Sequence, residues 1–346
     1  MRKGFGKRLL TVFLVLCLVF ASGCTARDDS SKGEKLNIVT TIFPVCDWVK
    51  ELCRDSEGGY TADITFLLDN GSDMHSYLPS ASDIVKISES DVFIYVGGES
   101  DDWIDDTLKQ TGRTDLVVIE LMELLGDRAR EEEDTGIVSG SHEHHHGEEE
   151  DHEHEDEHEH DEDEHEEEYD EHIWLSLINA EVCCASIAER LKEADPEHAD
   201  LYDQNLENYL EKLSELDKRY AEAAENRSYE MILVADRFPL RYLVDDYDIE
   251  YVAAFDGCSA DTQASFSLIV ELTEEMNEHG LDHVIVLEGS SMRIAHTVIE
   301  SSGRSDADIL VFDSIQSVRK SDADSGTTYL KIMEKNLEVL RTALGS

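Results

Sequence analysis

A dense run of histidine and acidic residues between positions 142 and 172 is the part of the chain best suited to chemistry. It contains ten histidines and nineteen aspartates or glutamates, with no lysine or arginine. Neutral imidazole binds zinc and other transition metals, and carboxylates add oxygen ligands. Only Tyr169 could contribute to a hydrophobic core. We therefore expect residues 141–171 to form a disordered loop that collects metal without a fixed coordination geometry.

Five further polar residues occupy positions where a metal could be held with defined geometry. Four follow or close short apolar runs that are typical of strands, and the fifth lies where the acidic run meets Ile173 and Trp174. Ligands of open α/β sheets bind beyond the carboxyl ends of the strands. Two histidines and two or three carboxylates there can complete a four-ligand site for a divalent metal. The five are His75, His172, Asp236, Glu288 and Asp313.

Each of these residues also has an ordinary structural interpretation. His75 could simply lie in a surface loop, and His172 could be the last member of the solvated run. Asp236 could cap a helix and Asp313 a turn, while Glu288 could pair with a nearby arginine. Their joint occurrence at neighbouring strand ends favours the metal site over these separate explanations.

The elements that would position these residues alternate between strands and helices. This alternation predicts an α/β fold of two lobes, each with a mostly parallel sheet flanked by helices. In the second lobe we expect helices near 262–279, 291–302 and 327–343. The predicted strands are 36–42, 64–68, 92–97 and 116–120 in the first lobe, and 231–235, 251–255, 284–288 and 309–313 in the second.

A helical segment separates the two lobes. One helix is expected near 178–194, and a second over 195–226, with Asp195 as N-cap and Pro196 in the first turn. At about 1.5 Å per residue the second helix would be about 45 Å long, enough to join two lobes rigidly. The expected organisation is a first lobe over 36–180, a helical linker over 181–226 and a second lobe over 227–346.

The N-terminus indicates export. Four positive charges within the first eight residues precede the apolar run LLTVFLVLCLVFA, which is too short for a comfortable membrane-spanning helix. The ending FASGC resembles a bacterial lipobox. We therefore expect a lipoprotein signal peptide over 1–23, lipidation of Cys24 and a flexible tether over 24–35. The mature protein would be extracytoplasmic and anchored to the cell membrane by its lipid.

Charge and cysteine content narrow the function further. The net charge of −51 argues against nucleic acid and anionic surfaces as partners. Five cysteines remain beyond the signal segment, and an odd number argues against a complete disulfide framework. Cys183 and Cys184 lie in an apolar helical stretch, where we expect buried free thiols, with a metal or disulfide role as the alternative. The five are Cys46, Cys53, Cys183, Cys184 and Cys258.

Several segments, in order along the chain, resemble the zinc/manganese ABC-transporter solute-binding proteins. The histidine-rich insertion lies where zinc-type members of that family have theirs. The similar segments are NIVTTIFPVCDWVKEL, the stretch beginning DMHSYLPSASDIVK, HIWLSLINA, DPEHADLYDQNLENYLEKL, VIVLEG and FDSI.

The resemblance implies a metal site between the lobes, with His75, His172 and Asp313 as ligands. At the remaining ligand position the sequence reads VADRF, and a gap-free match places Ala235 there. Asp236 is then the neighbouring substitute, and Glu288 or water could also coordinate. Two histidines with carboxylates would suit manganese, whereas the histidine-rich insertion favours zinc. We expect Zn²⁺, with Mn²⁺ as the alternative.

The function implied by the resemblance is capture and delivery without catalysis. A monomer would bind divalent metal between its lobes and deliver it to a membrane permease driven by a separate ATPase. The chain contains neither a GxxxxGK[ST] phosphate loop nor the HExxH motif of many metalloproteases, so we do not expect an enzyme. The alternatives are a manganese-specific member of the family, or a surface adhesin lipoprotein in which metal is only structural.

Overall fold

The computed structural model describes residues 35–132, 138–140, 169–257 and 264–346. The signal peptide, Cys24, Cys258 and most of the tether and histidine-rich loop lie outside the described residues. Leu36–Ser346 form one compact unit. Within the described ranges no helix has both the length and the apolar character needed to cross a membrane.

The first lobe is built on a four-stranded sheet of order β2-β1-β3-β4 in which every pairing is parallel. A capping box between Ser80 and Asp83 starts helix α3, since each residue's side chain accepts the other's backbone N–H. The strands are β1 Leu36–Thr40, β2 Ala62–Phe66, β3 Val92–Tyr95 and β4 Val117–Glu120; the helices and 3-10 turns are α2 Phe43–Leu52, η1 Met74–Ser76, α3 Ala81–Glu89, η2 Glu99–Asp101, α4 Trp103–Thr111, α5 Leu121–Leu125 and η3 Gly126–Arg128.

The second lobe contains a five-stranded sheet of order β5-β7-β6-β8-β9. Its pairings are parallel except for that of β5 (Val138–Gly140) with β7. The other strands are β6 Met231–Phe238, β7 Glu250–Asp256, β8 His283–Leu287 and β9 Asp308–Phe312; the helices are α8 Arg241–Asp246, α9 Phe266–Glu278 and α10 Arg293–Ser302. Helix α11 (Lys320–Asp324) lies against the first lobe, where the Lys320 backbone N–H donates to the Asp69 carbonyl at 2.8 Å.

The fold class and all eight predicted strands are confirmed, and two differences stand out. The three-residue strand β5 was not predicted, and it pairs in the second sheet although it lies in the segment assigned to the first lobe. The long helix was predicted to begin after Asp195, whereas α7 (Ala199–Glu225) begins after the 3-10 turn Pro196–His198. The Asp195 carboxylate accepts hydrogen bonds from His198 and Tyr202 instead of capping the helix.

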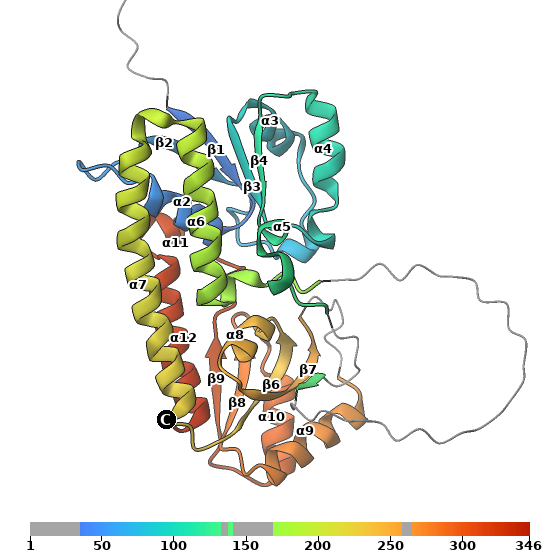
Figure 1. The fold of residues 1–346 in the computed structure, drawn as a ribbon. Coiled ribbons are helices and arrows are strands. Elements are labelled where there is room, and N and C mark those ends of the chain that lie inside the picture. The colour runs from blue at the N-terminus through green and yellow to red at the C-terminus, as the bar shows by residue number, and fades with distance from the viewer. Residues whose placement is uncertain (1–34, 133–137, 141–168, 258–263) are drawn as a thin grey trace, which may run out of the picture. The chain divides into compact units, whose positions relative to one another are not determined.

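Helices α6 (Leu177–Ala194), α7 and α12 (Tyr329–Leu344) join the lobes. Helix α7 packs against α6, α2 and α12, and runs alongside both sheets in Figure 1. One hydrophobic core extends from β3 of the first lobe, through α6, α7 and α12, to β6 of the second. A shared core resists large relative movement, because separating the lobes would expose well-packed apolar side chains.

The thiols in the described part of the chain are buried and free, as predicted for the adjacent pair. These are Cys46, Cys53, Cys183 and Cys184. Burial raises the pKa of Cys183 to about 12 and that of Cys46 to about 11. Both thiols stay protonated at neutral pH and are poor nucleophiles or metal ligands.

Asp47 provides a test of the packing between α2 and α12. The side chain is buried, and its carboxylate accepts the backbone N–H of Tyr329 at 2.8 Å. Burial raises the pKa of Asp47 to about 6. Because the folded state then binds this proton more tightly than the unfolded chain, the stability contribution of Asp47 falls as pH rises from about 4 to 6.

We therefore predict that Asp47→Asn, which keeps an acceptor but removes the charge, stabilises the protein relative to wild type above pH 6. The expected gain is roughly 1–3 kcal/mol at pH 7.5 and little or none at pH 4. Urea unfolding at the two pH values measures it. Asp63→Asn, at an exposed position on β2, serves as the control. A gain that does not depend on pH would contradict the prediction.

Candidate metal centre

His75 is placed by the short turn η1, which follows β2 in the first lobe. Its backbone N–H is accepted by the Asp73 carboxylate at 3.1 Å, and this cap fixes the start of the turn. The ring Nδ1 lies 2.9 Å from Ser100 Oγ and 3.3 Å from Glu171 Oε2. A neutral His75 that donates from Nδ1 therefore has its lone pair on Nε2.

His172 lies just before the turn η4 (Ile173–Leu175) and is fully buried, with 0% exposure. Asp170 Oδ1 accepts its backbone N–H at 2.8 Å and lies 2.9 Å from its ring Nδ1. The carbonyl of Asp170 in turn accepts the hydroxyl of Tyr242, from α8 of the second lobe, at 2.7 Å. Asp170 thus holds the His172 ring in the tautomer whose Nε2 is free to bind a metal.

The two histidines face one another through these Nε2 atoms, which are 3.1 Å apart. With each Nδ1 donating to a carboxylate or hydroxyl, the two Nε2 lone pairs converge on one point. Two imidazoles bound to one tetrahedral zinc, at about 2.05 Å each, would have their nitrogens about 3.3 Å apart. The pair therefore already has nearly the spacing of two ligands on one metal ion.

Asp170 and Glu171 were missed by the sequence analysis, which assigned them to the disordered loop 141–171. The structure buries both residues, and Glu171 Oε1 accepts the backbone N–H of Ser100 at 2.7 Å. Gly98, at φ +87°, permits this approach, because a Cβ there would lie 2.5 Å from Glu171 Oε1. The sequence signal that could have found them is the apolar turn Ile173–Leu175, because its burial also buries Asp170 and Glu171 together with His172.

Contacts from the second lobe close around the pair. The Trp174 indole, whose ring centroid is 5.3 Å from that of His172, donates to the Ser314 carbonyl at 2.9 Å. Arg237, from β6, donates to Asp73 at 2.7 Å. Burial disfavours the charged form of Asp73, but the hydrogen bond and charge of Arg237 prevail and lower its pKa. Both lobes therefore build the surroundings of the histidine pair.

Two of the predicted carboxylates lie together after neighbouring strands. Glu288 follows β8 and accepts both the backbone N–H and the hydroxyl of Ser314, at 2.8 and 2.7 Å. Asp313 follows β9 and accepts the N–H of Ile315 at 2.9 Å. Burial raises the pKa of both carboxyls, and the charge of Asp313 adds to the increase at Glu288. A nearby cation would relieve both increases.

The backbone beside this pair is strained. Ile315 is fully buried and adopts φ +66°, a conformation that is costly for a β-branched residue. Such strain persists where the surroundings impose it, and it is frequent at binding sites. Asp313 also caps a turn, as its structural interpretation suggested, by accepting the N–H of Ile315. Glu288 was expected to pair with an arginine in that interpretation, but its hydrogen-bond partner is Ser314.

The third predicted carboxylate, Asp236, lies near the end of β6, where the strand register shifts between Val234 and Arg237. Its oxygens accept the N–H groups of Arg237 at 3.0 Å and Leu287 at 3.4 Å. It does not cap α8, whose N-cap is Leu240. Among the residues that the structure describes, no three His, Cys, Asp or Glu side chains are grouped to hold a metal. The structure brings the two histidines together, and the three carboxylate ligands stay predictions.

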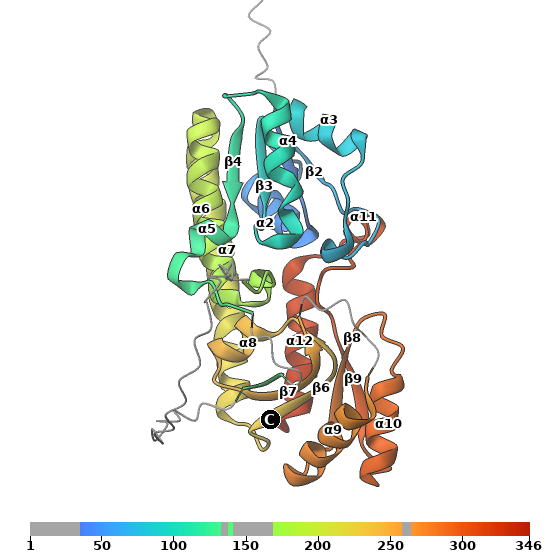
Figure 2. The ribbon, with the colours of Figure 1, turned by 90° about the vertical axis from the view of Figure 1, so that its right-hand side faces the viewer.

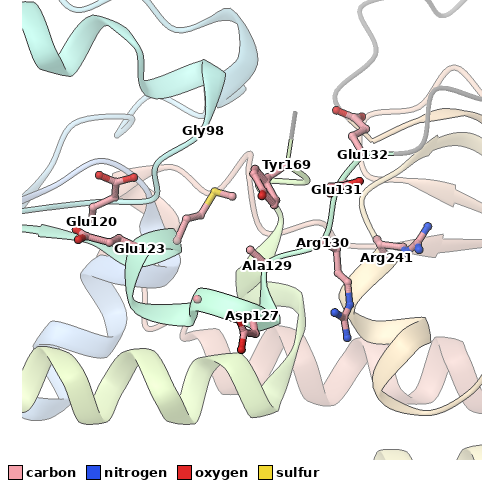
Figure 3. Close-up of a pocket in the computed structure, with 12 residues that line it drawn as sticks. Gly98, Glu120, Glu123, Asp127, Ala129, Arg130, Glu131, Glu132, Tyr169 and Arg241 are labelled. Atoms are coloured by element: carbon pink, nitrogen blue, oxygen red, sulfur yellow. The ribbon is translucent and has the colours of Figure 1, made fainter. Parts of the chain in front are cut away.

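An acidic cavity of 840 Å³ lies beside the two ends of the histidine-rich loop. In Figure 3, Tyr169 stands between Glu120 and Glu123 on one side and Glu131 and Glu132 on the other. The described chain stops at Glu132 and resumes at Tyr169, and between them only β5 is described. Gly98, which contacts Glu171, also lines this cavity. A cavity of this charge concentrates cations near the site.

The family comparison identifies the kind of protein to which this centre belongs. The model of the family described as "ZnuA: Zinc-uptake complex component A periplasmic" matches residues 38–343. The chain belongs to this family. The resemblance inferred from the ordered segments is thereby confirmed, and the two-lobed fold is that of its ZnuA-like relatives.

Relatives of this ZnuA-family chain include zinc-binding proteins. The zinc-binding lipoprotein AdcA of Streptococcus pneumoniae is 29% identical over 97% of the chain, which spans 60% of that relative. The high-affinity zinc uptake system protein ZnuA of Bacillus subtilis is 27% identical, over 96% of both chains. The Zn(II)-bound ZnuA-like domain of the pneumococcal AdcA superposes with a TM-score of 0.66 at 26% identity, over 90% of this chain and all of that domain.

Asp170 gives a test of the ring orientation that is separate from the ligands themselves. We predict that Asp170→Asn weakens zinc binding by about 10- to 100-fold. The neutral amide accepts the Nδ1–H of His172 more weakly than the charged carboxylate does, so it no longer fixes the tautomer of the ring. Competition with a chromophoric chelator, in a chain without residues 142–168, measures the change. Asp245→Asn is the control, because this carboxylate pairs with Arg130 and Arg241. Unchanged affinity would show that Asp170 does not orient the ring.

Proposed function

We propose that this protein is the extracytoplasmic solute-binding component of a zinc ABC transporter. It captures Zn²⁺ between its lobes and delivers it to a membrane permease that a separate ATPase drives. The observation that carries this proposal is the pair of convergent Nε2 atoms, 3.1 Å apart. Imidazole nitrogens are good zinc ligands, and the histidine-rich run favours zinc over manganese, which a site of two histidines and carboxylates would also suit. The zinc-binding relatives support the same metal.

The second lobe would complete the coordination of the metal. Asp313 is the first candidate, because the segment FDSI resembles the family segment that carries the last ligand and Asp313 follows β9 beside Glu288. Asp236 and Glu288 are the other candidates. The remaining positions would be filled by water or by a small-molecule ligand. If Asp236 or Glu288 supplies the fourth ligand, the closed site leaves no position for the water that a hydrolase activates.

The remaining parts of the chain fit the same role. A lipid on Cys24 would keep the protein at the outer face of the membrane, close to its permease. The histidine-rich run would collect cations by weak multidentate binding, and the acidic cavity beside it would hold them near the centre. Because one core joins the lobes, release would require only a modest rearrangement at the permease.

Metal titration of a soluble form tests the proposal. A chain that begins at residue 25 would be stripped with chelator and titrated with zinc and manganese, with and without residues 142–168. We expect one tight zinc site that survives the deletion and binds manganese much more weakly. Loss of all tight binding on deletion would make the run the sole metal binder and would remove the main support for the transport role.

A further inference from the structure

The two chain segments at the base of the histidine-rich insertion form an irregular backbone pairing. Glu131 and Tyr169 make an antiparallel bridge, and Arg130 and Asp170 are the next residues toward the core. These four residues are here called the insertion base. In a regular antiparallel ladder, Arg130 and Asp170 would exchange two N–H···O bonds. The Asp170 N–H donates to the Arg130 carbonyl at 2.8 Å as expected, but the Arg130 N–H donates to a side chain instead.

The hydroxyl of Tyr242 is inserted where the second backbone bond would be. It accepts the Arg130 N–H at 3.1 Å and donates to the Asp170 carbonyl at 2.7 Å. Burial raises the pKa of Tyr242, so the hydroxyl stays protonated and able to donate. Tyr242 belongs to α8, which lies on the side of the second lobe that faces α5 in both Figure 1 and Figure 2. One oxygen from the second lobe therefore joins both segments of the insertion base.

Asp170 carries this contact to the histidine centre. Its backbone N–H and carbonyl are held by Arg130 and Tyr242. Its side-chain Oδ1 lies 2.8 Å from the backbone nitrogen of His172 and 2.9 Å from the ring Nδ1. Hydrogen bonds weaken steeply when they are misaligned, so the carboxylate orients the ring only while its own backbone is fixed. The Tyr242 hydroxyl is therefore one residue away from the bond that sets the His172 tautomer.

Packing alone already limits the movement of the His172 ring. The Trp174 ring centroid lies 5.3 Å from that of His172. On another side, a Cβ at Gly257, just after β7, would lie 3.2 Å from the ring Cε1. The ring therefore keeps its place when the Tyr242 hydroxyl is removed, and the hydrogen bond at Nδ1 is what changes. This bond decides which ring nitrogen carries the proton and which has the free lone pair.

We propose that Tyr242 is a positioning residue of the histidine centre, and that its hydroxyl couples the second lobe to the tautomer of His172 through the backbone of Asp170. This inference rests on the proposed zinc function and deepens it. The affinity of the centre depends on where α8 holds the insertion base. Movement of α8 away from Arg130 and Asp170 lowers zinc affinity without any contact to the two histidines.

Tyr242→Phe, which removes the hydroxyl and keeps the ring, tests this inference with two readouts. Heteronuclear NMR of isotope-labelled histidine in the metal-free chain from residue 25 reports the tautomer at a pH where the ring is neutral, and the His172→Ala spectrum identifies the His172 signals. We expect the Nδ1–H tautomer in the wild type and a mixture of both tautomers in Tyr242→Phe. Chelator competition in the chain without residues 142–168 should show zinc affinity reduced by about tenfold, the lower end of the loss for groups that orient a ligand.

Tyr247→Phe is the matched control. Tyr247 directly follows α8, is buried, and donates its hydroxyl to Asp217 of α7 at 3.0 Å. Its loss removes a comparable hydrogen bond without reaching Asp170, so tautomer and zinc affinity should stay as in the wild type. A wild-type tautomer or wild-type zinc affinity in Tyr242→Phe would overturn the inference, as would equal changes in both variants. If the wild type bound no zinc tightly, the proposed function would fail, while a tautomer change confined to Tyr242→Phe would still support the positioning role.

Discussion

Replacing His172 with alanine is expected to weaken zinc binding at the centre by at least about a hundredfold. Loss of a partner that only orients a ligand costs about 10- to 100-fold, and His172 is itself the proposed ligand. The ring is fully buried and its Nε2 faces that of His75 at 3.1 Å.

The measurement requires a background without residues 142–168, because the nine histidines of that segment would otherwise bind zinc in every variant. Chelator competition then reports the affinity of the centre alone. His296→Ala, at an exposed position on α10, is the matched control and should leave the affinity unchanged. Equal zinc affinity in His172→Ala and His296→Ala would show that the pair is a buried hydrogen-bonded contact and would end its interpretation as a metal centre.

His75→Ala in the same background extends the test. If both histidines bind one ion, the double variant should lose little more than either single variant, because the second substitution removes a ligand from a site already lost. Additive losses would instead indicate two independent sites. The geometry predicts the first result, since the two Nε2 atoms share one point of convergence.

The strands and the long helix were predictable because their signals are local. Eight apolar runs of five to seven residues alternate with helical periodicity, and each became a strand whose ends lie within three residues of those predicted. Strand β5 was not predictable in this way, because three residues such as Val138–Gly140 carry too little pattern. The start of α7 shifted because Asp195 found side-chain partners in His198 and Tyr202.

The histidines of the centre were predictable from their places relative to strands and to the Ile173–Trp174–Leu175 turn. Their carboxylate partners were not. Asp170 and Glu171 have the same composition as the seventeen acidic residues before them in the run, and only contacts with Ser100 and Tyr242, far away in sequence, distinguish them. Such long-range burial leaves no periodic signal in the acidic segment itself.

Trp174 connects the histidine centre to the core of both lobes, and Trp174→Ala is expected to destabilise the protein by about 3–5 kcal/mol. The side chain is fully buried. Its indole donates to the Ser314 carbonyl of the second lobe, and its own carbonyl accepts the Tyr329 hydroxyl of α12 at 2.6 Å. Removing the ring would leave a cavity beside His172 and an unsatisfied carbonyl at Ser314.

Urea unfolding of wild type and variant measures the loss. Phe266→Ala removes an aromatic ring that is 85% exposed and should change stability by no more than about 0.5 kcal/mol. Trp174→Phe keeps most of the ring but removes the donor to Ser314, and should cost about 1–3 kcal/mol. A loss below about 1 kcal/mol for Trp174→Ala would contradict the packing described here.

The two tryptophan variants also separate stability from metal binding. Trp174→Phe leaves an aromatic ring against His172, so its zinc affinity should stay near that of the wild type at pH 7.5 even though the folded state is less stable. Trp174→Ala removes the support of the His172 ring and should weaken zinc binding in addition to unfolding more readily. Both variants lack the hydrogen bond to Ser314, but only Trp174→Ala lacks the ring. If both lost zinc affinity equally, the hydrogen bond to the second lobe would determine the geometry of the centre more than the packing against His172.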